Sequence, residues 1–205
     1  IVSYGGLSGE YWWYARDNVW EEPRLNRYFP RETLDARSIR RETAPDWDYY
    51  HIEVARALKQ LRDAGVRIQT SSHGQLQGLA NHWEIWMLTQ GGFTPFEALR
   101  AATIDGAESI GMGRYFGSLE AGKKADLVVL NSNPLEDIRR SADTAMVMVG
   151  GRLFDLGADM AEVGGRGAPA PQFYWQRHRE GRNFGLEYGP TMPCHCPKSG
   201  VPHAH

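Results

Sequence analysis

The second quarter of the chain alternates the signals of helix and strand, and this alternation restricts the fold more than any other feature. Residues 48–64 carry apolar side chains at helical spacing, namely Val54, Leu58 and Leu61. Gly65 suits the left-handed position after a helix, and residues 66–70 then alternate as in a short strand. A polar loop and a second helix over residues 80–90 follow. This order predicts an α/β protein built of βα-repeats.

The loop after this strand carries the densest group of side chains with catalytic chemistry. It holds His73, Gln75 and Gln77, and the helix that follows carries His82 and Glu84. In parallel α/β folds the loop leaving the carboxyl end of a strand is where ligands bind. We therefore favour an active-site role for His73 over that of a polar residue capping a strand. For His82 a hydrogen bond to the loop and a substrate contact both stay open, and Glu84 is interpreted as structural.

Composition excludes several function classes. The formal net charge is −2 and no run of Lys and Arg occurs, so nothing favours nucleic-acid binding. No apolar stretch approaches the roughly 20 residues that cross a bilayer. Hydrophobic residues make up 41% of the chain, as in globular proteins. The two cysteines, Cys194 and Cys196, are too few for a disulfide framework.

The remaining segments differ in composition and in periodicity. Residues 1–4 resemble a strand, and residues 7–48 form a long irregular segment rich in Trp, Pro and charge. That segment is either a lid over a site or an insertion packed on the surface by its aromatic side chains. Thr94, Pro95 and Glu97 form a capping box at the start of a further helix.

The last third of the chain predicts a small β unit. Residues 125–130 form a short apolar run typical of a buried strand, and Gly150-Gly151 joins two strands as a hairpin. From about residue 164 the chain has no periodicity and is interpreted as a tail. That tail ends with side chains suited to a soft metal, which are Cys194, His195, Cys196, His203 and His205. Incidental thiols in a tail are the favoured interpretation.

Three strings of the sequence resemble one enzyme superfamily. TPFEALRAATIDGAESIGM, GSLEAGKKADLVVLNSNPLEDIR and MVMVGGRLFD resemble the C-terminal part of the amidohydrolase superfamily, closest to its imidazolonepropionase- and prolidase-like branch. Within that branch, SHGQLQGLANHWEIWMLTQGG resembles amidohydrolases that are fused to TolB-like propellers. The similarity covers about residues 48–156.

The resemblance implies an architecture. The family fold is a (β/α)₈ TIM-like barrel with a small β-sandwich, so residues 1–115 would supply the last βα units and residues 116–156 strands of the sandwich. Residues 7–48 would be a lid-like insertion, and residues 157–205 an irregular Gly- and Pro-rich tail. The family's first metal-binding motif, a His-x-His that follows the first barrel strand, is absent from this sequence. We therefore expect a C-terminal fragment of a larger enzyme.

The resemblance also implies chemistry. Relatives place an Asp after the last barrel strand, where it binds metal and acts as a general base, and His73 stands at the matching position. Imidazole binds divalent zinc well, and its ordinary pKa of about 6.5 suits a base near neutrality. We expect His73 to be a catalytic residue and a ligand of a divalent metal, with zinc the expected ion. The substrate-binding residues expected around it are Gln75, His82, Tyr11 and Trp12.

The predicted function is metal-dependent hydrolysis of a C–N bond in a small-molecule amide or cyclic amide. The alternative is a non-catalytic amidohydrolase-like binding module that has lost the usual Asp. Expected partners are the N-terminal part of the same protein and a TolB-like propeller, and the resemblance also allows a homo-oligomer. It favours a periplasmic or secreted location.

Overall fold

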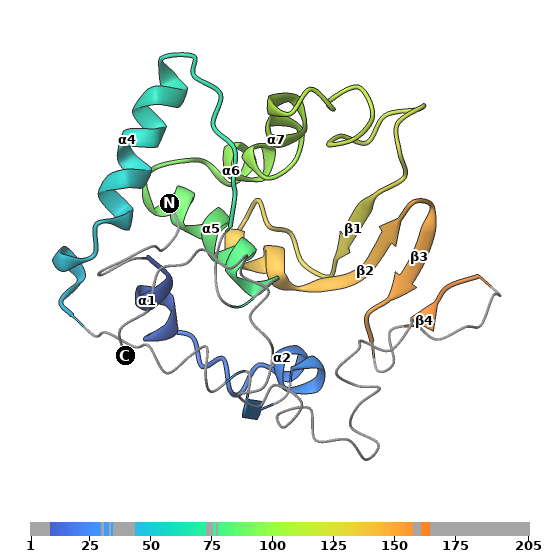
Figure 1. Ribbon diagram of the computed structural model, residues 1–205, viewed down its shortest axis with the longest axis horizontal. Helices are drawn as coiled ribbons and strands as arrows, with labels where there is room; N and C mark the ends of the chain where they lie inside the picture. The colour runs from blue at the N-terminus through green and yellow to red at the C-terminus, as the bar shows by residue number, and fades with distance from the viewer. Residues whose placement is uncertain are drawn as a thin grey trace, which may run out of the picture. The chain divides into compact units, whose positions relative to one another are not determined.

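The computed structural model describes residues 9–29, 31–32, 34, 44–72, 76, 78–157 and 161–164. Helices precede a small sheet along the chain, which confirms the mixed α/β class (Figure 1). The helices are α1 (Gly9–Tyr14), α2 (Pro23–Tyr28), α4 (His51–Asp63), α5 (Leu79–Gln90), α6 (Pro95–Ala101) and α7 (Ile104–Ser109), with short 3₁₀ turns η1 (Asp46–Asp48) and η2 (Ile138–Ala142). The strands are β1 (Leu127–Leu130), β2 (Thr144–Val149), β3 (Arg152–Asp155) and β4 (Ala161–Glu162). In the described ranges, no helix is long and apolar enough to span a bilayer.

Helix α4 forms where predicted but packs by a different face. The expected stripe was wrong, because Val54 and Leu61 are exposed while His51 and Ala55 are fully buried. The reason is the close approach of helix α5: a methyl group added to Gly91 would lie 2.3 Å from the Cβ of Ala55. The small side chain of Ala55 therefore faces the neighbouring helix, Leu58 packs partly buried against the core, and Val54 and Leu61 turn outward.

The capping box of helix α6 is confirmed. The Thr94 hydroxyl accepts from the Glu97 amide at 3.2 Å, and the Glu97 carboxylate accepts from the Thr94 amide at 2.9 Å. Two donors that would be unpaired at the helix start are satisfied reciprocally. This local chemistry fixes the first turn of the helix, independently of packing.

The predicted strand over residues 66–70 is not part of a sheet. This segment has no strand pairing among the described residues, and the Thr70 amide donates instead to the Ala101 carbonyl at 3.1 Å. A strand needs a ladder partner for its backbone groups, and here helix α6 supplies only one acceptor. Ile68 is buried, but Val66 is 47% exposed, so the predicted alternation is retained only in part.

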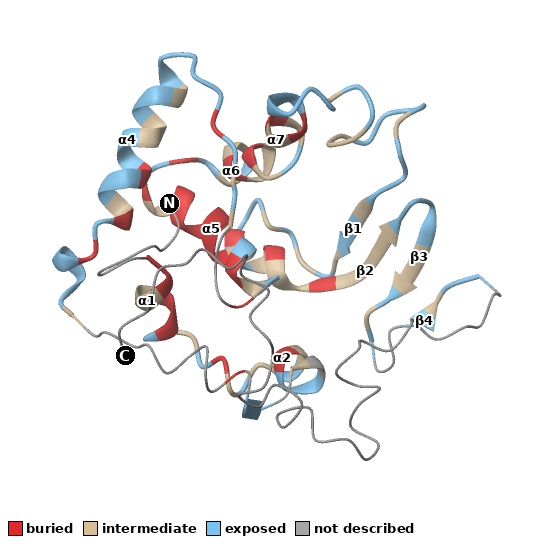
Figure 2. Cartoon of the chain, in the orientation of Figure 1, coloured by how far each residue is buried: buried red, intermediate tan, exposed pale blue. Residues whose placement is uncertain are grey.

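The described strands form one antiparallel sheet in the order β1-β2-β3-β4. The predicted hairpin is confirmed, since β2 and β3 are joined by Gly150 and Gly151 with φ of 58° and 80°. Asp126 supports this turn by accepting from the Gly150 amide at 2.6 Å. The prediction that β1 is buried was wrong: Val128 is 56% exposed and Val129 40%, and among the described strands β1 lies at the edge of the sheet, paired with β2 (Figure 2).

Helix α5 is the centre of the hydrophobic core. Six consecutive residues from Trp83 to Leu88 are buried, so the helix is covered on all sides, and Figure 2 shows most of it as buried. Helices α1, α4 and α6 and the turn η2 all pack against it. The predicted lid-like segment contributes to the same core through Trp13, Tyr14, Val19, Leu25 and Leu34.

Asp17 links three parts of this core. Its carboxylate accepts from the Trp83 indole at 2.8 Å and from the Arg139 guanidinium at 2.9 Å. The same guanidinium lies 5.6 Å from the Trp13 ring centre and 5.4 Å from that of Trp86. One arginine therefore joins the N-terminal segment, helix α5 and the turn η2 by an ion pair and by cation–π contacts.

Replacing Gly91 with Ala tests the contact between helices α4 and α5. The added methyl group would overlap the Ala55 backbone, so we expect the protein to lose about 1–3 kcal/mol in its free energy of unfolding. Urea denaturation followed by circular dichroism measures the loss. Gly106→Ala is the matched control, because its methyl group meets only ordinary contacts of 3.5 Å or more. Equal denaturation midpoints for both variants would contradict the close approach.

Replacing Asp17 with Ala tests the link in the core. The Trp83 indole is 1% exposed and would lose its acceptor, and Arg139 would lose its counter-ion. We expect a loss of about 1–3 kcal/mol in the free energy of unfolding, mainly from the unsatisfied buried donor. The control Asp48→Ala removes an exposed carboxylate of turn η1 and should leave the urea midpoint nearly unchanged. A midpoint for Asp17→Ala equal to this control would be inconsistent with the link.

Candidate functional site

The loop predicted to carry catalysis lies between two fixed points. His73, Gln75 and Gln77 themselves fall outside the described residues. Before them, Ile68 is buried and the Thr70 amide is bonded to Ala101. Between Gln75 and Gln77, Leu76 is fully buried and its carbonyl accepts from the Ala80 amide at 2.8 Å. The backbone is thus anchored before His73 and again at Leu76.

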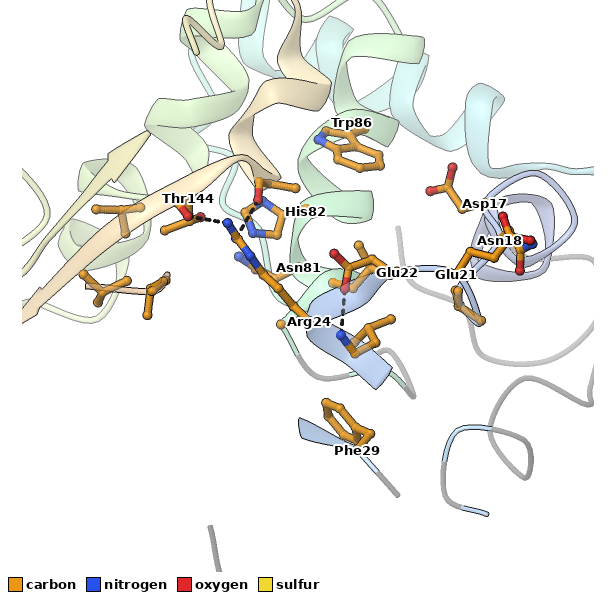
Figure 3. A pocket seen from close by; sticks show the side chains of 18 residues that line it. Asp17, Asn18, Glu21, Glu22, Arg24, Phe29, Asn81, His82, Trp86 and Thr144 are labelled. Atoms are coloured by element: carbon orange, nitrogen blue, oxygen red, sulfur yellow. Dashed lines mark hydrogen bonds between the residues drawn. The ribbon is translucent and has the colours of Figure 1, made fainter. Parts of the chain in front are cut away.

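A cavity of about 730 Å³ opens beside the start of helix α5, next to this loop (Figure 3). Its walls come from three parts of the chain: the first turns of α5, residues 17–29, and the sheet with the turn before β2. Apolar lining is provided by Leu25, Phe29, Leu79, Val128, Val147 and Leu156. The size and the mixture of apolar surface with a few polar groups are typical of small-molecule sites.

His82 lines this cavity and is held by a buried hydroxyl. Its Nδ1 lies 3.1 Å from the Ser141 hydroxyl oxygen, which also accepts from the Trp86 indole at 2.9 Å. The Ser141 oxygen has two lone pairs, so after accepting from the indole it can either donate to Nδ1 or accept from it. The direction of this bond sets which ring nitrogen of His82 carries the proton. Burial lowers the pKa of His82, and the positive charge of Arg24 lowers it further.

Arg24 supplies the cation of the same wall. Its guanidinium donates to the carbonyls of Ala142 and Thr144, which ties helix α2 to the segment entering β2. Both acceptors are neutral, and no described carboxylate lies within ion-pair distance of Arg24. Figure 3 shows Arg24, His82 and Thr144 on one side of the cavity. This side therefore presents N–H donors and a positive charge without an ion-pair partner among the described residues.

Three carboxylates lie elsewhere in the lining: Asp17, Glu21 and Glu22. Asp17 is occupied by Trp83 and Arg139, as described above. Glu22 caps helix α2, where its carboxylate accepts from the Leu25 amide at 2.7 Å. Glu21 is exposed at the edge. The acidic groups are thus largely engaged by the fold or by solvent.

The two predicted aromatic contacts lie on helix α1. The indole of Trp12 donates to Asp46 at 3.2 Å, and the Arg16 guanidinium lies 3.9 Å from its ring centre. Tyr11 is half-buried on the same helix. Neither residue lines the cavity, and their role toward His73 stays a prediction.

Two further ionisable residues are buried away from the cavity. His51 is fully buried, and this burial lowers its pKa. Its Nε2 lies 3.1 Å from the Gln90 amide oxygen, a contact that opposes the shift in part. Glu84 is 3% exposed within helix α5, and burial raises the pKa of its carboxyl group. Both residues lie where helices meet, which agrees with structural roles.

The described part of the chain does not form a metal site by itself. Within it, no three His, Cys, Asp or Glu side chains converge as a metal would require. The predicted ligand His73 lies outside the described residues, as do Cys194, Cys196, His203 and His205. A divalent metal therefore belongs to the proposal for the whole protein and has no ligand set among the described side chains.

Sequence reasoning singled out His82 but missed its partners. Arg24 and Ser141 belong to segments 58 or 59 residues away from His82, and no local motif marks either of them. Ser141 lies in a five-residue 3₁₀ turn and Arg24 in a six-residue helix. Arg24 is identified by its place in the cavity lining, and Ser141, which lies outside the lining, by its contact with His82.

The pKa of His82 provides a test of this geometry. Because folding lowers it, His82 contributes stability that is present above about pH 6.5, the ordinary value, and is lost as the pH falls toward the folded-state pKa. Arg24→Gln removes one of the two causes and should raise the pKa without restoring it fully. Nuclear magnetic resonance titration of the imidazole signals measures this shift. An unchanged pKa in Arg24→Gln, or an equal change in the control Arg27→Gln on the same helix, would contradict the placement.

The chain matches one protein family over most of its described length. The model of the amidohydrolase family matches residues 31–154, which include helices α4 to α7 and strands β1 and β2. An imidazolonepropionase of Geobacillus kaustophilus is 60% identical over 40 residues, which are 20% of this chain and 9% of that protein. An ochratoxinase of Aspergillus niger is 41% identical over 69 residues, which are 32% of this chain and 14% of that protein.

Solved structures give a likeness of the same kind. A Xaa-Pro dipeptidase with bound methionine is 26% identical with a TM-score of 0.46, over 50% of this chain and 25% of that one. A TM-score below 0.5 does not establish a shared fold. The chain spans only a minor part of each of these relatives. Since the family model covers more than half of the sequence, the chain belongs to the amidohydrolase family.

Proposed function

We propose that the protein is a metal-dependent hydrolase that cleaves C–N bonds of amides or cyclic amides. The observation that carries this proposal is the match to the amidohydrolase family over residues 31–154, which contains the loop of His73. In this proposal the chain contributes the last βα units of a (β/α)₈ barrel and strands of a small β-sandwich. The N-terminal part of the same protein supplies the rest of the barrel and the His-x-His motif.

The anchored loop supports a role in catalysis. Catalytic groups must be held within a fraction of an ångström by the elements that carry them. The bond from Thr70 to Ala101 and the buried Leu76 fix the backbone before and after His73. Segments held by the core lose less entropy on binding than free ones, so the anchored residues Thr70 and Leu76 support a functional site in this part of the chain.

The chemistry assigned to each part is simple. A divalent metal such as zinc, when bound, polarises a carbonyl and lowers the pKa of a bound water molecule. His73 would bind this metal or accept a proton, and either task needs a neutral imidazole. Gln75, Tyr11 and Trp12 are proposed as substrate contacts. A TolB-like propeller partner and a periplasmic or secreted location are further proposals that rest on the resemblance.

Substitution of His73 in the intact protein tests the proposal. The assay combines metal analysis with a screen of amide and lactam substrates. His73→Ala should lower turnover at least about a hundredfold, as expected for loss of a general base, with an unchanged thermal midpoint. His73→Asp introduces the residue of the relatives and should retain part of the activity. Gln69→Ala, an exposed neighbour, is the control and should keep the parental rate.

Two outcomes would count against this function. Parental turnover in His73→Ala with unchanged bound metal would remove His73 from the site. An intact protein that binds no metal and hydrolyses none of the substrates would favour the non-catalytic binding module.

A further inference from the structure

The cavity beside helix α5 has donors on one wall that the fold does not use. Arg24 carries five N–H groups, and the described bonds to Ala142 and Thr144 occupy only two of its nitrogens. On His82, Ser141 occupies Nδ1, which leaves Nε2 as the ring atom open to a ligand. Both residues line the cavity, so its polar wall offers more hydrogen-bond donors than the described acceptors use.

The positive charge of this wall has no ion-pair partner among the described residues. The guanidinium of Arg24 is bonded to two carbonyls, which hold its position but leave its charge in place. Asp143, whose pKa the charge of Arg24 helps to lower, lies outside the lining, and its carboxylate accepts from the side chains of Asn131 and Ser132. Its charge weakens the positive field of Arg24 but does not occupy the N–H groups.

The acidic side chains of the lining are engaged otherwise. Asp17 is bonded by Arg139 and Trp83, and Glu22 by the start of helix α2. Glu21 is exposed, where water screens its charge. Of the three carboxylates, only Asp17 has a cationic partner among the described contacts. An anion bound at Arg24 therefore meets attraction from the guanidinium and some repulsion from Glu21 and Glu22.

The hydroxyl of Ser141 influences which ring nitrogen of His82 carries the proton. Ser141 is 4% exposed, its oxygen accepts from the Trp86 indole, and it lies 3.1 Å from Nδ1 of His82. In the binding site inferred below, the Ser141 hydroxyl donates to Nδ1, so the neutral ring carries its proton on Nε2 and donates from there. Ser141 is thus a positioning residue, since it acts on a ligand only through His82.

The rest of the lining is apolar. Leu25 and Phe29 contribute from the α2 segment, and Val128 and Val147 from the sheet. A ligand confined to one small anion would leave this surface exposed to water. A ligand with a hydrocarbon body would cover it, at a gain of roughly 25 cal/mol for each Å² of apolar surface removed from water.

We propose that this cavity binds a small organic acid, whose carboxylate is held by Arg24 and by the Nε2–H of His82, and whose apolar body lies on Leu25, Phe29 and Val147. Arginine pairs with carboxylates in two-point geometry, and charge-assisted hydrogen bonds of this kind are stronger than neutral ones. This site goes beyond the proposed hydrolysis, because it requires neither His73 nor a metal.

Calorimetric titration of the intact protein with three matched probes tests the proposal. The probes are 3-phenylpropionate, 3-phenylpropan-1-ol and 3-phenylpropylammonium, which share a phenyl body and differ in the charge of the other end. We expect the carboxylate to bind about tenfold or more tightly than the alcohol, as a charge-assisted bond predicts. Arg24→Gln should remove this preference and leave the affinity for the alcohol unchanged. The control Arg27→Gln, on the same helix but outside the lining, should keep it.

A second pair of variants tests the positioning role of Ser141. Ser141→Ala should weaken carboxylate binding several-fold and shift the ¹⁵N signals of His82 toward a mixture of tautomers, a change that loss of packing alone would not produce. Ser141→Thr keeps the hydroxyl and should restore both. Equal affinity for the carboxylate and the alcohol, tighter binding of the ammonium probe, or an unchanged preference in Arg24→Gln would each overturn the proposal. Since binding is measured without turnover, a failure here leaves the hydrolase proposal open to its own test.

Discussion

One carboxylate, that of Asp17, connects three distant parts of the described chain. Asp17 and Arg139 lie 122 residues apart, and their pairing brings the N-terminal segment against the turn that leads into β2. The rings of Trp13 and Trp86 line the guanidinium, and the Trp83 indole donates to the carboxylate. Each partner is thus satisfied by more than one group, which is what an ion pair in a partly buried position requires.

Helix α5 connects this link to the rest of the hydrophobic core. Its apolar residues face all directions, so every neighbouring segment can bury surface against it. Gly91 permits helix α4 to approach closely at its end, and Ser141 bonds to its Trp86 from the side of the sheet. The same helix follows the loop of His73 directly and carries His82. A single element therefore positions the core, the predicted catalytic loop and the cavity.

The positive charge on the cavity wall is positioned by backbone carbonyls. Arg24 is placed by two carbonyls of the chain entering β2, which hold a charge at the cavity wall without neutralising it. Burial and that charge both lower the pKa of His82, and the buried hydroxyl of Ser141 lies within hydrogen-bond distance of its Nδ1. The donors of this wall are Arg24 of helix α2 and His82 of helix α5, and Ser141 of the turn η2 contacts His82.

Local chemistry let the sequence predict several features of this protein. The capping box at Thr94, the hairpin at Gly150-Gly151 and the existence of helix α4 depend on neighbouring residues, and the motifs of residues 94–154 indicated the amidohydrolase family. Tertiary structure decided the rest. It turned Ala55 and not Val54 inward, left residues 66–70 without a ladder partner among the described residues, and exposed the edge strand β1. It also brought Arg24 and Ser141 to His82, because contacts between distant segments leave no local pattern in the sequence.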